Sequence, residues 1–119
     1  MPLNYQLQNR ASKIDGKGAF TLEEIPARKK IGNLGGEIIT LREARKRTVQ
    51  TKRVAMVEFG DGRALDASKQ PNELRYVNHS CNPNTYMRVC YSQVEFYTLR
   101  AINIDEELTC NYGSTHHDG

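Results

Sequence analysis

The sequence predicts a mainly β fold, a β-rich α+β domain made of small sheets. Most apolar segments are short, alternate with polar residues and end at turn formers, which gives about eight short strands. Helical character is confined to residues 41–47. The 119 residues, 38% hydrophobic and 26% charged, suffice for one domain with one core. We expect a single domain over 1–119, with a core at about 13–113 and a polar tail at 114–119.

The N-terminal half contains the weaker strand signals and the helix. Thr40 is a suitable N-cap, and Glu43, three residues later, completes a capping box. The helix is therefore expected to begin at Leu41. The strands expected in this half are a weak edge strand at 3–7, an extended stretch from 19, and short strands at 30–32 and 37–40.

The C-terminal half predicts two hairpins and a last strand. The first hairpin joins 54–59 to 63–67 across a Gly-Asp-Gly turn. The second joins 85–91 to 93–101, and a final strand lies in LTCNYG. Between the hairpins stands RYVNHSCNPN, residues 75–84, whose turn formers suit neither a helix nor an ordinary strand.

Two polar segments leave their role open. The turn Gly16-Lys17-Gly18 is a plain β-turn or a place where a ligand approaches the backbone closely. The basic run at 42–53 is a solvated helix face, or it holds an acidic partner or a phosphate backbone. No aromatic residue lies within this run, whereas single-stranded nucleic-acid sites use aromatic side chains for stacking.

Cysteine usage and hydropathy restrict the class of protein. The three cysteines have irregular spacing and no C-x-x-C pair, so neither a disulfide framework nor a metal site is predicted. No apolar segment is long enough to span a membrane, and the first residues do not resemble a signal peptide. We expect an intracellular, cytoplasmic protein, with the nucleus or a host nucleus as alternatives.

The order of two motifs gives a sharper indication. Residues 75–84, Arg-Tyr-Val-Asn-His-Ser-Cys-Asn-Pro-Asn, and 107–112, Glu-Leu-Thr-Cys-Asn-Tyr, resemble the two strongest motifs of the SET-domain protein lysine methyltransferases. Three further stretches are similar to other motifs of that family: Gly16 to Phe20, Leu34 to Ile39, and Leu65 to Ala67 with Asn72. The resemblance covers about residues 13–113.

The resemblance implies a fold, a reaction and a cofactor. The fold would be a SET-domain fold of small curved sheets, a β-clip, with a C-terminal pseudoknot. The reaction would be methyl transfer from S-adenosyl-L-methionine to the lysine ε-amine of a protein, a histone-like protein being one candidate. The resemblance assigns the catalytic role to Tyr112. It assigns cofactor binding to Gly16, Lys17, Gly18, Ala19, Arg75, Tyr76, Asn78 and His79, and the lysine channel to Leu34, Tyr86, Met87 and Cys110.

The sequence departs from the family pattern at three positions. Leu34 and Cys110 replace a tyrosine and a phenylalanine, and Asn111 replaces an aspartate. The small Cys110 would leave room for a second methyl group. The family's later cysteine cluster is also missing, so a partner chain, the tail or the substrate would complete the channel. Homodimerisation is one such route.

Two other functions stay open at this point. One is a noncatalytic SET module that binds peptide or cofactor, which Leu34 and Cys110 favour. The other is a basic nucleic-acid-binding domain, although direct nucleic-acid binding is not expected of the enzyme. The net charge of +3 is weak evidence for either.

Overall fold

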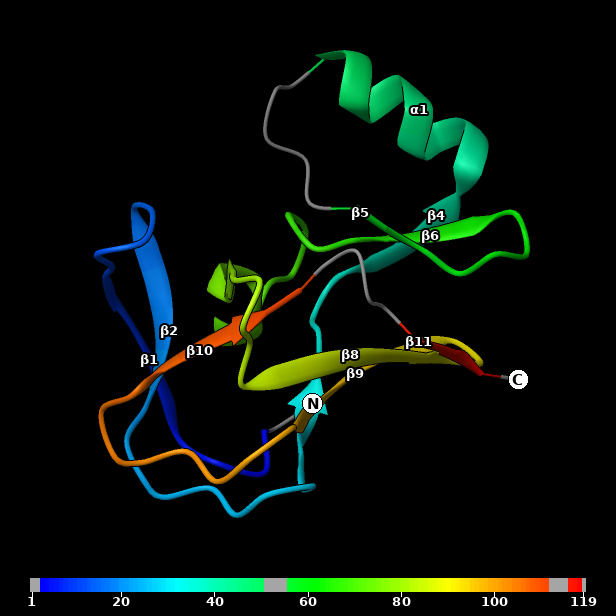
Figure 1. Cartoon of the computed structure of the whole chain (residues 1–119). Helices are drawn as coiled ribbons and strands as arrows, with labels where there is room; N and C mark the ends of the chain where they lie inside the picture. Colours follow the sequence, from blue (N-terminus) through cyan, green and yellow to red (C-terminus); the bar gives the residue numbers. More distant parts are fainter. Residues whose placement is uncertain (1–2, 51–55, 112–115, 119) are drawn as a thin grey trace.

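The computed structural model describes residues 3–50, 56–111 and 116–118 (Figure 1). Strands predominate, as predicted. They are β1 (Leu7–Ala11), β2 (Lys17–Thr21), β3 (Lys30–Asn33), β4 (Glu37–Thr40), β5 (Met56–Glu58), β6 (Arg63–Asp66), β7 (Asn78–His79), β8 (Thr85–Cys90), β9 (Gln93–Thr98), β10 (Glu107–Cys110) and β11 (His116–Asp118). The helices are α1 (Leu41–Gln50) and a short 3-10 helix, η1 (Glu73–Tyr76).

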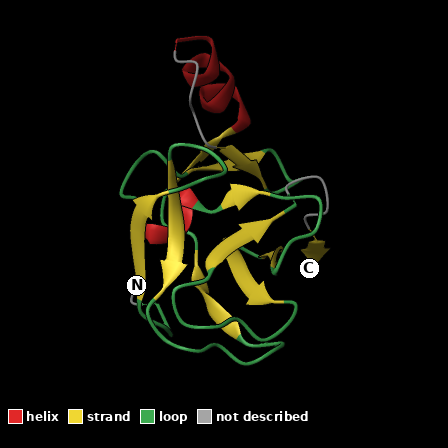
Figure 2. Cartoon of the chain, turned by 60° about the vertical axis from the view of Figure 1, so that its left-hand side comes forward, coloured by secondary structure: helices red, strands yellow, loops and turns green. Residues whose placement is uncertain are grey.

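The strands form two sheets. The larger has the order β1-β2-β10-β8-β9-β3, with β7 beside β10 and β11 beside β8. The smaller has the order β4-β6-β5. In Figures 1 and 2 the smaller sheet and α1 lie at one end of the molecule, and the larger sheet curls through the rest.

Alternating burial on β8 places one face of the larger sheet against the core. Thr85, Met87 and Val89 are buried, whereas the residues between them are partly exposed. Phe96 on β9 and Leu108 on β10 are also fully buried. The spacing of two that the sequence shows at 85–90 is therefore the spacing of a half-buried strand.

The helix begins where the capping box predicts. Thr40 Oγ1 accepts a hydrogen bond from the Glu43 amide at 3.1 Å. Arg47 then ties α1 to the smaller sheet through ion pairs with Glu37 of β4 (2.7 Å) and Asp66 of β6 (2.8 Å). Ion pairs therefore hold the helix in place more than apolar packing does, because Ala44 is its one buried side chain among those described.

The hairpins 56–66 and 85–98 are confirmed, but the expected position of the N-terminal edge strand is wrong. The edge strand lies at 7–11 instead of 3–7, because residues 7–11 are in register with β2. Leu3 instead covers Gly32, where an added Cβ would lie 2.5 Å from the leucine side chain. Residues 116–118 of the expected polar tail form β11, which pairs in parallel with β8.

Neither described helix is long and apolar enough to cross a membrane.

Candidate active site

The irregular segment 75–84 is held against the last long strand. Its central pair, Asn78-His79, forms β7 and lies in parallel register with Thr109-Cys110 of β10. The Ser80 amide donates to the Cys110 carbonyl at 3.0 Å. Backbone groups of this polar segment are thus paired with a distant part of the chain, which is what a partly buried irregular segment requires.

Asn78 joins this segment to the turn before β2. Its Nδ2 lies 3.1 Å from the Asp15 carbonyl and 3.0 Å from the Lys17 carbonyl. The same nitrogen lies 3.2 Å from Ser12 Oγ and 3.0 Å from Glu107 Oε2. An amide has two N–H groups, so these four acceptors share them. One side chain therefore gathers three segments that are far apart in sequence.

Two cations lie against the ring of Tyr76. Lys17 Nζ is 5.5 Å from the ring centroid, and the guanidinium carbon of Arg75 is 5.4 Å from it. Each contact is a favourable cation–π interaction, but two cations at one ring also repel each other. A bound anion beside Tyr76 would relieve that repulsion.

Of the expected Gly16-Lys17-Gly18 turn, Gly16 lies in the turn before β2, whereas Lys17 and Gly18 are the first residues of β2. Gly16 has φ = +43°, a conformation that favours glycine. Gly18 is buried, and a Cβ there would lie 2.2 Å from Glu107 Oε2. Ala19, the next residue, is fully buried. Without side chains at Gly16 and Gly18, the backbone here lies close to Asn78 and Glu107.

Three of the four residues expected in the lysine channel are part of the protein's hydrophobic core, which 17 buried residues form. Leu34, Met87 and Cys110 all belong to the buried core cluster. Burial raises the pKa of the Cys110 thiol to about 12. Tyr86 does not join them: it lies on the other face of β8 and stacks on Tyr97, with ring centroids 5.5 Å apart. Tyr112 lies outside the described residues.

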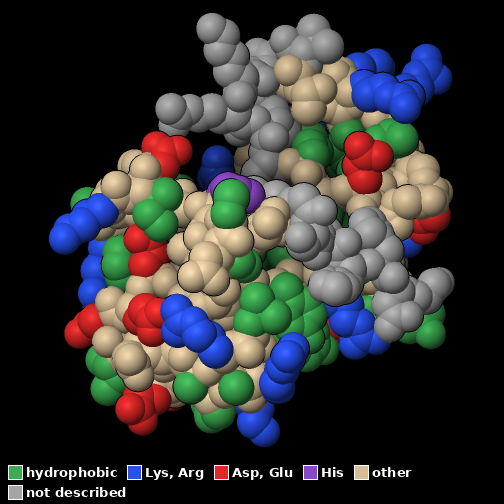
Figure 3. Space-filling view, viewed as in Figure 1, with side chains coloured by type: hydrophobic (Ala, Val, Ile, Leu, Met, Phe, Trp, Pro, Cys, Tyr) green, Lys and Arg blue, Asp and Glu red, His purple; other side chains and the backbone are tan. Residues whose placement is uncertain are grey.

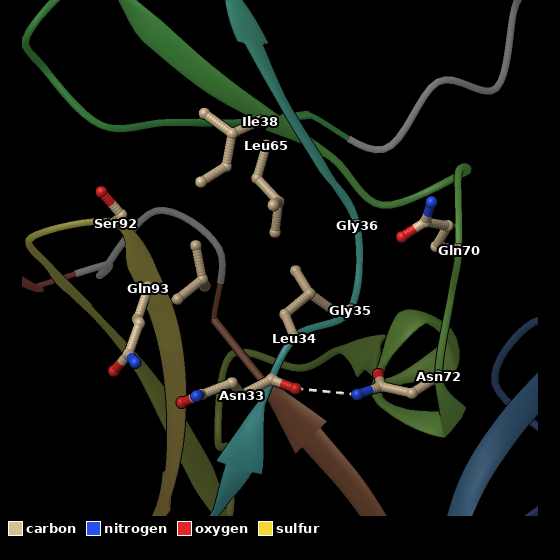
Figure 4. Close-up of a pocket in the computed structure, with 11 residues that line it drawn as sticks. Asn33, Leu34, Gly35, Gly36, Ile38, Leu65, Gln70, Asn72, Ser92 and Gln93 are labelled. Carbon is tan, nitrogen blue, oxygen red and sulfur yellow. Dashed lines mark hydrogen bonds between the residues drawn. The ribbon is translucent and has the colours of Figure 1, made fainter. Parts of the chain in front are cut away.

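A pocket of about 330 Å³ opens beside Leu34, between the two sheets. In Figure 4 the side chains of Leu34, Ile38 and Leu65 converge on it. Amide side chains lie at its rim, and Asn72 Nδ2 there donates to the Asn33 carbonyl at 2.8 Å. The pocket therefore has an apolar floor and a polar rim. This combination suits an extended peptide, whose backbone is polar and whose side chains can be apolar.

His79 and Cys81 lie together at the surface, 3.8 Å apart between Nε2 and Sγ. Both side chains are exposed. Within the described part of the chain, no group of three or more His, Cys, Asp or Glu side chains could hold a metal ion. The pair is therefore a local contact on the surface next to Asn78.

Sequence reasoning missed two residues of the Asn78 cluster. Glu107 belongs to a family motif that assigns it no role, and Ser12 lies outside every motif. Ser12 Oγ lies 2.9 and 2.8 Å from the two carboxylate oxygens of Glu107. The glutamate stands in a recognisable motif and could have been found, whereas no signal in the sequence marks Ser12.

Comparisons with known proteins agree with this geometry. The family profile described as "SET domain" matches residues 16–113. The chain belongs to the SET-domain family. A solved structure titled "Crystal structure of an active polycomb repressive complex 2 in the basal state" has a chain similar to this SET domain, with a TM-score of 0.83 and 25% identity. The match covers 92% of this chain and 15% of that one, and it confirms the predicted SET-domain fold.

Curated relatives are much longer than this SET domain. "Histone-lysine N-methyltransferase trithorax" of Drosophila virilis is 32% identical over 109 residues, which is 85% of this chain and 3% of the relative. "Histone-lysine N-methyltransferase MEDEA" of Arabidopsis thaliana is 31% identical over 116 residues, which is 90% of this chain and 17% of the relative. The chain thus spans a small part of the length of each.

Proposed function

We propose that this SET domain is a protein lysine N-methyltransferase that uses S-adenosyl-L-methionine. The observation that supports this most is the Asn78 cluster. It places the Asn-His motif, the Gly-x-Gly turn and the strand that leads to Tyr112 within hydrogen-bond distance of one another. The SET-domain relatives named as histone-lysine methyltransferases favour the same reaction.

The residues around Asn78 and Tyr76 fit the chemical groups of S-adenosyl-L-methionine. Its carboxylate would suit the two cations at Tyr76, Lys17 and Arg75. Its ammonium would suit the carbonyls and carboxylate of the Asn78 cluster, which are acceptors. We assign cofactor binding to Gly16, Lys17, Gly18, Ala19, Arg75, Tyr76, Asn78 and His79.

When bound, this cofactor supplies an electrophilic methyl group on a positively charged sulfur. The chain must then present an uncharged lysine amine, although the ordinary pKa of lysine is about 10.4. The hydrophobic core, to which Leu34, Met87 and Cys110 belong, would disfavour the ammonium form by desolvation. Tyr112 would orient the amine through its hydroxyl, as the family motif implies.

The pocket beside Leu34 is the proposed docking place for the protein substrate. It adjoins the hydrophobic core through Leu34, so a peptide lying there could direct one lysine side chain inward. The polar rim could bond the peptide backbone, and the apolar floor could hold a neighbouring side chain. A histone-like protein is the proposed substrate, because the relatives are named for histone lysine.

A methyl-transfer assay tests the proposal. Purified protein is incubated with radiolabelled S-adenosyl-L-methionine and mixed histones, and label in protein is counted after gel separation. We expect incorporation that Tyr112→Phe reduces by about 10²-fold or more. Wild-type protein that transfers no label to any histone while binding the cofactor would instead indicate a noncatalytic SET module.

Completion of the lysine channel by a second copy of the chain stays a prediction. Sedimentation velocity on the purified protein, with and without cofactor, tests it.

A further inference from the structure

The outward face of α1 carries three positive charges. Arg42, Arg45 and Lys46 are exposed and stand at helical spacings of three and four, so their side chains share one face. Figure 3 shows Lys and Arg side chains gathered at the upper right, where Figure 1 places α1. We call Arg42, Arg45 and Lys46 the basic face.

The described residues do not neutralise the basic face. Among the described residues, none of its three members forms an ion pair with a carboxylate. Glu43, the acidic residue within the helix, pairs inward with Arg47 at 3.0 Å. Like charges at these spacings destabilise a helix by roughly 0.2–0.5 kcal/mol a pair. The arrangement costs stability and provides no internal contact.

The helix is nevertheless well anchored on its opposite side. Arg47 bonds Glu37 and Asp66 of the smaller sheet, and Ala44 is buried. Arg42, Arg45 and Lys46 are therefore presented on a fixed support. Their Cβ atoms lie about 5–6 Å apart, and their long side chains can adjust to a row of anions.

We propose that the basic face binds the phosphate backbone of duplex nucleic acid, independently of base sequence. Among the exposed residues described on α1, only Thr48 joins the three cations, so no aromatic or large apolar anchor is present. Protein interfaces take most of their affinity from such anchors, whereas phosphate binding depends on charge. Single strands are disfavoured too, because they need aromatic side chains to stack their bases.

This binding goes beyond methyl transfer and does not require it. It replaces the expectation from sequence that the enzyme does not bind nucleic acid directly. It would recruit the SET domain to a protein substrate that is itself bound to a duplex. A basic, histone-like tail would be repelled by the basic face, while the nucleic acid that carries such a tail would be attracted.

The test is fluorescence anisotropy of a labelled 20-base-pair duplex, with no cofactor present. Three phosphate contacts give a salt slope of about −2.7, so affinity should fall about 40-fold between about 50 and about 200 mM salt. The triple change Arg42→Gln, Arg45→Gln and Lys46→Gln should lower affinity at the low salt by about tenfold or more and reduce the slope by about 2–3.

A matched control removes the same charge elsewhere. Lys13, Arg28 and Lys29 are exposed, form no ion pair among the described residues and lie outside α1. The variant Lys13→Gln, Arg28→Gln and Lys29→Gln should keep the wild-type slope. Thermal unfolding checks that both variants fold.

Equal losses in the two triple variants would overturn the proposal, because net charge alone would then explain binding. Tighter binding of a poly-glutamate peptide than of the duplex would overturn it in favour of an acidic protein partner. Cofactor binding and methyl transfer to isolated peptides are measured separately, so a failure here is distinguishable from a failure of the proposed function.

Discussion

Asn84 and Thr109 exchange hydrogen bonds across 25 residues of sequence. The Thr109 amide donates to Asn84 Oδ1 at 2.8 Å, and the Asn84 amide donates to Thr109 Oγ1 at 3.2 Å. Asn84 Nδ2 also donates to the Glu107 carbonyl at 2.8 Å. Both side chains are buried. The Asn84 side chain therefore pairs with backbone groups of β10, as the backbone of a neighbouring strand would.

Replacing Asn84 should destabilise the fold. Asn84→Ala removes the side-chain hydrogen bonds to Thr109, Glu107 and Glu106, and it leaves the buried Thr109 amide without its partner. We expect a loss of about 2–4 kcal/mol in the free energy of unfolding, measured by urea titration. Asn82→Ala is the control, because Asn82 is exposed. A similar small effect for both changes would contradict the bridging role.

Arg47 should determine part of the acid stability. Burial alone would raise the pKa of Asp66, but hydrogen bonds from Ser68 and Arg47 outweigh it and hold the pKa of this carboxyl below its usual value. The ion pair's stabilisation is thus complete above the unfolded carboxyl pKa of about 3.9 and is lost as pH falls through the lower folded value. Arg47→Met should lower the free energy of unfolding at pH 7, because it leaves the buried Asp66 carboxylate without its cation.

The same variant should also have a flatter pH dependence of unfolding below about pH 4. The control is Arg10→Met, which breaks an ion pair with Asp105, whose side chain is 62% exposed. That change should cost at most about 1 kcal/mol. If Arg47→Met retained the wild-type acid sensitivity, another carboxylate would have to be responsible.

Cys81 and Cys110 should differ in reactivity. Burial raises the pKa of Cys110 to about 12, so almost none of it is thiolate at pH 8, whereas Cys81 is exposed. Brief iodoacetamide treatment followed by peptide mass mapping should find Cys81 modified and Cys110 intact. Modification of Cys110 at the rate of Cys81 would show that the hydrophobic core opens in solution.

The size of Cys110 should affect how many methyl groups are added. We expect wild-type protein to place at least two methyl groups on one lysine. Cys110→Phe should shift the product toward one methyl, at a cost of about 1–3 kcal/mol in stability, because the added ring must fit a fully buried site. Cys110→Ala keeps the space and should give the wild-type distribution. Mass spectrometry of a peptide methylated under excess cofactor measures the number of methyl groups on the lysine. A single methyl group added by wild-type protein would refute the expectation.

The elements with local signals were predictable from sequence. Thr40 and Glu43 mark the start of α1, and the alternation at 85–90 marks β8. The Asn-His motif pointed to the candidate site through its family resemblance. The long-range partners could not be predicted, because nothing local shows that Ser12 would meet Glu107.

The sequence also did not show to which face of the sheet each side chain of a short strand points. Tyr86 and Met87 are adjacent and both suited an aromatic or apolar wall, but the strand directs them to opposite faces. The shift of β1 to 7–11 has the same origin: register with β2 decides where the strand lies, and the weak alternation at 3–7 does not.

Calorimetric titration with S-adenosyl-L-methionine tests the central claim most directly. The claim is that Asn78 and its neighbours form the cofactor site. Wild-type protein should bind the cofactor, and Asn78→Ala should weaken binding by about tenfold or more. Asn4→Ala, which removes a hydrogen bond to the Lys30 carbonyl at 3.0 Å, should bind as wild type does. If wild-type protein shows no binding at millimolar cofactor, or if folded Asn78→Ala binds as tightly as wild type, the assignment of this site is wrong.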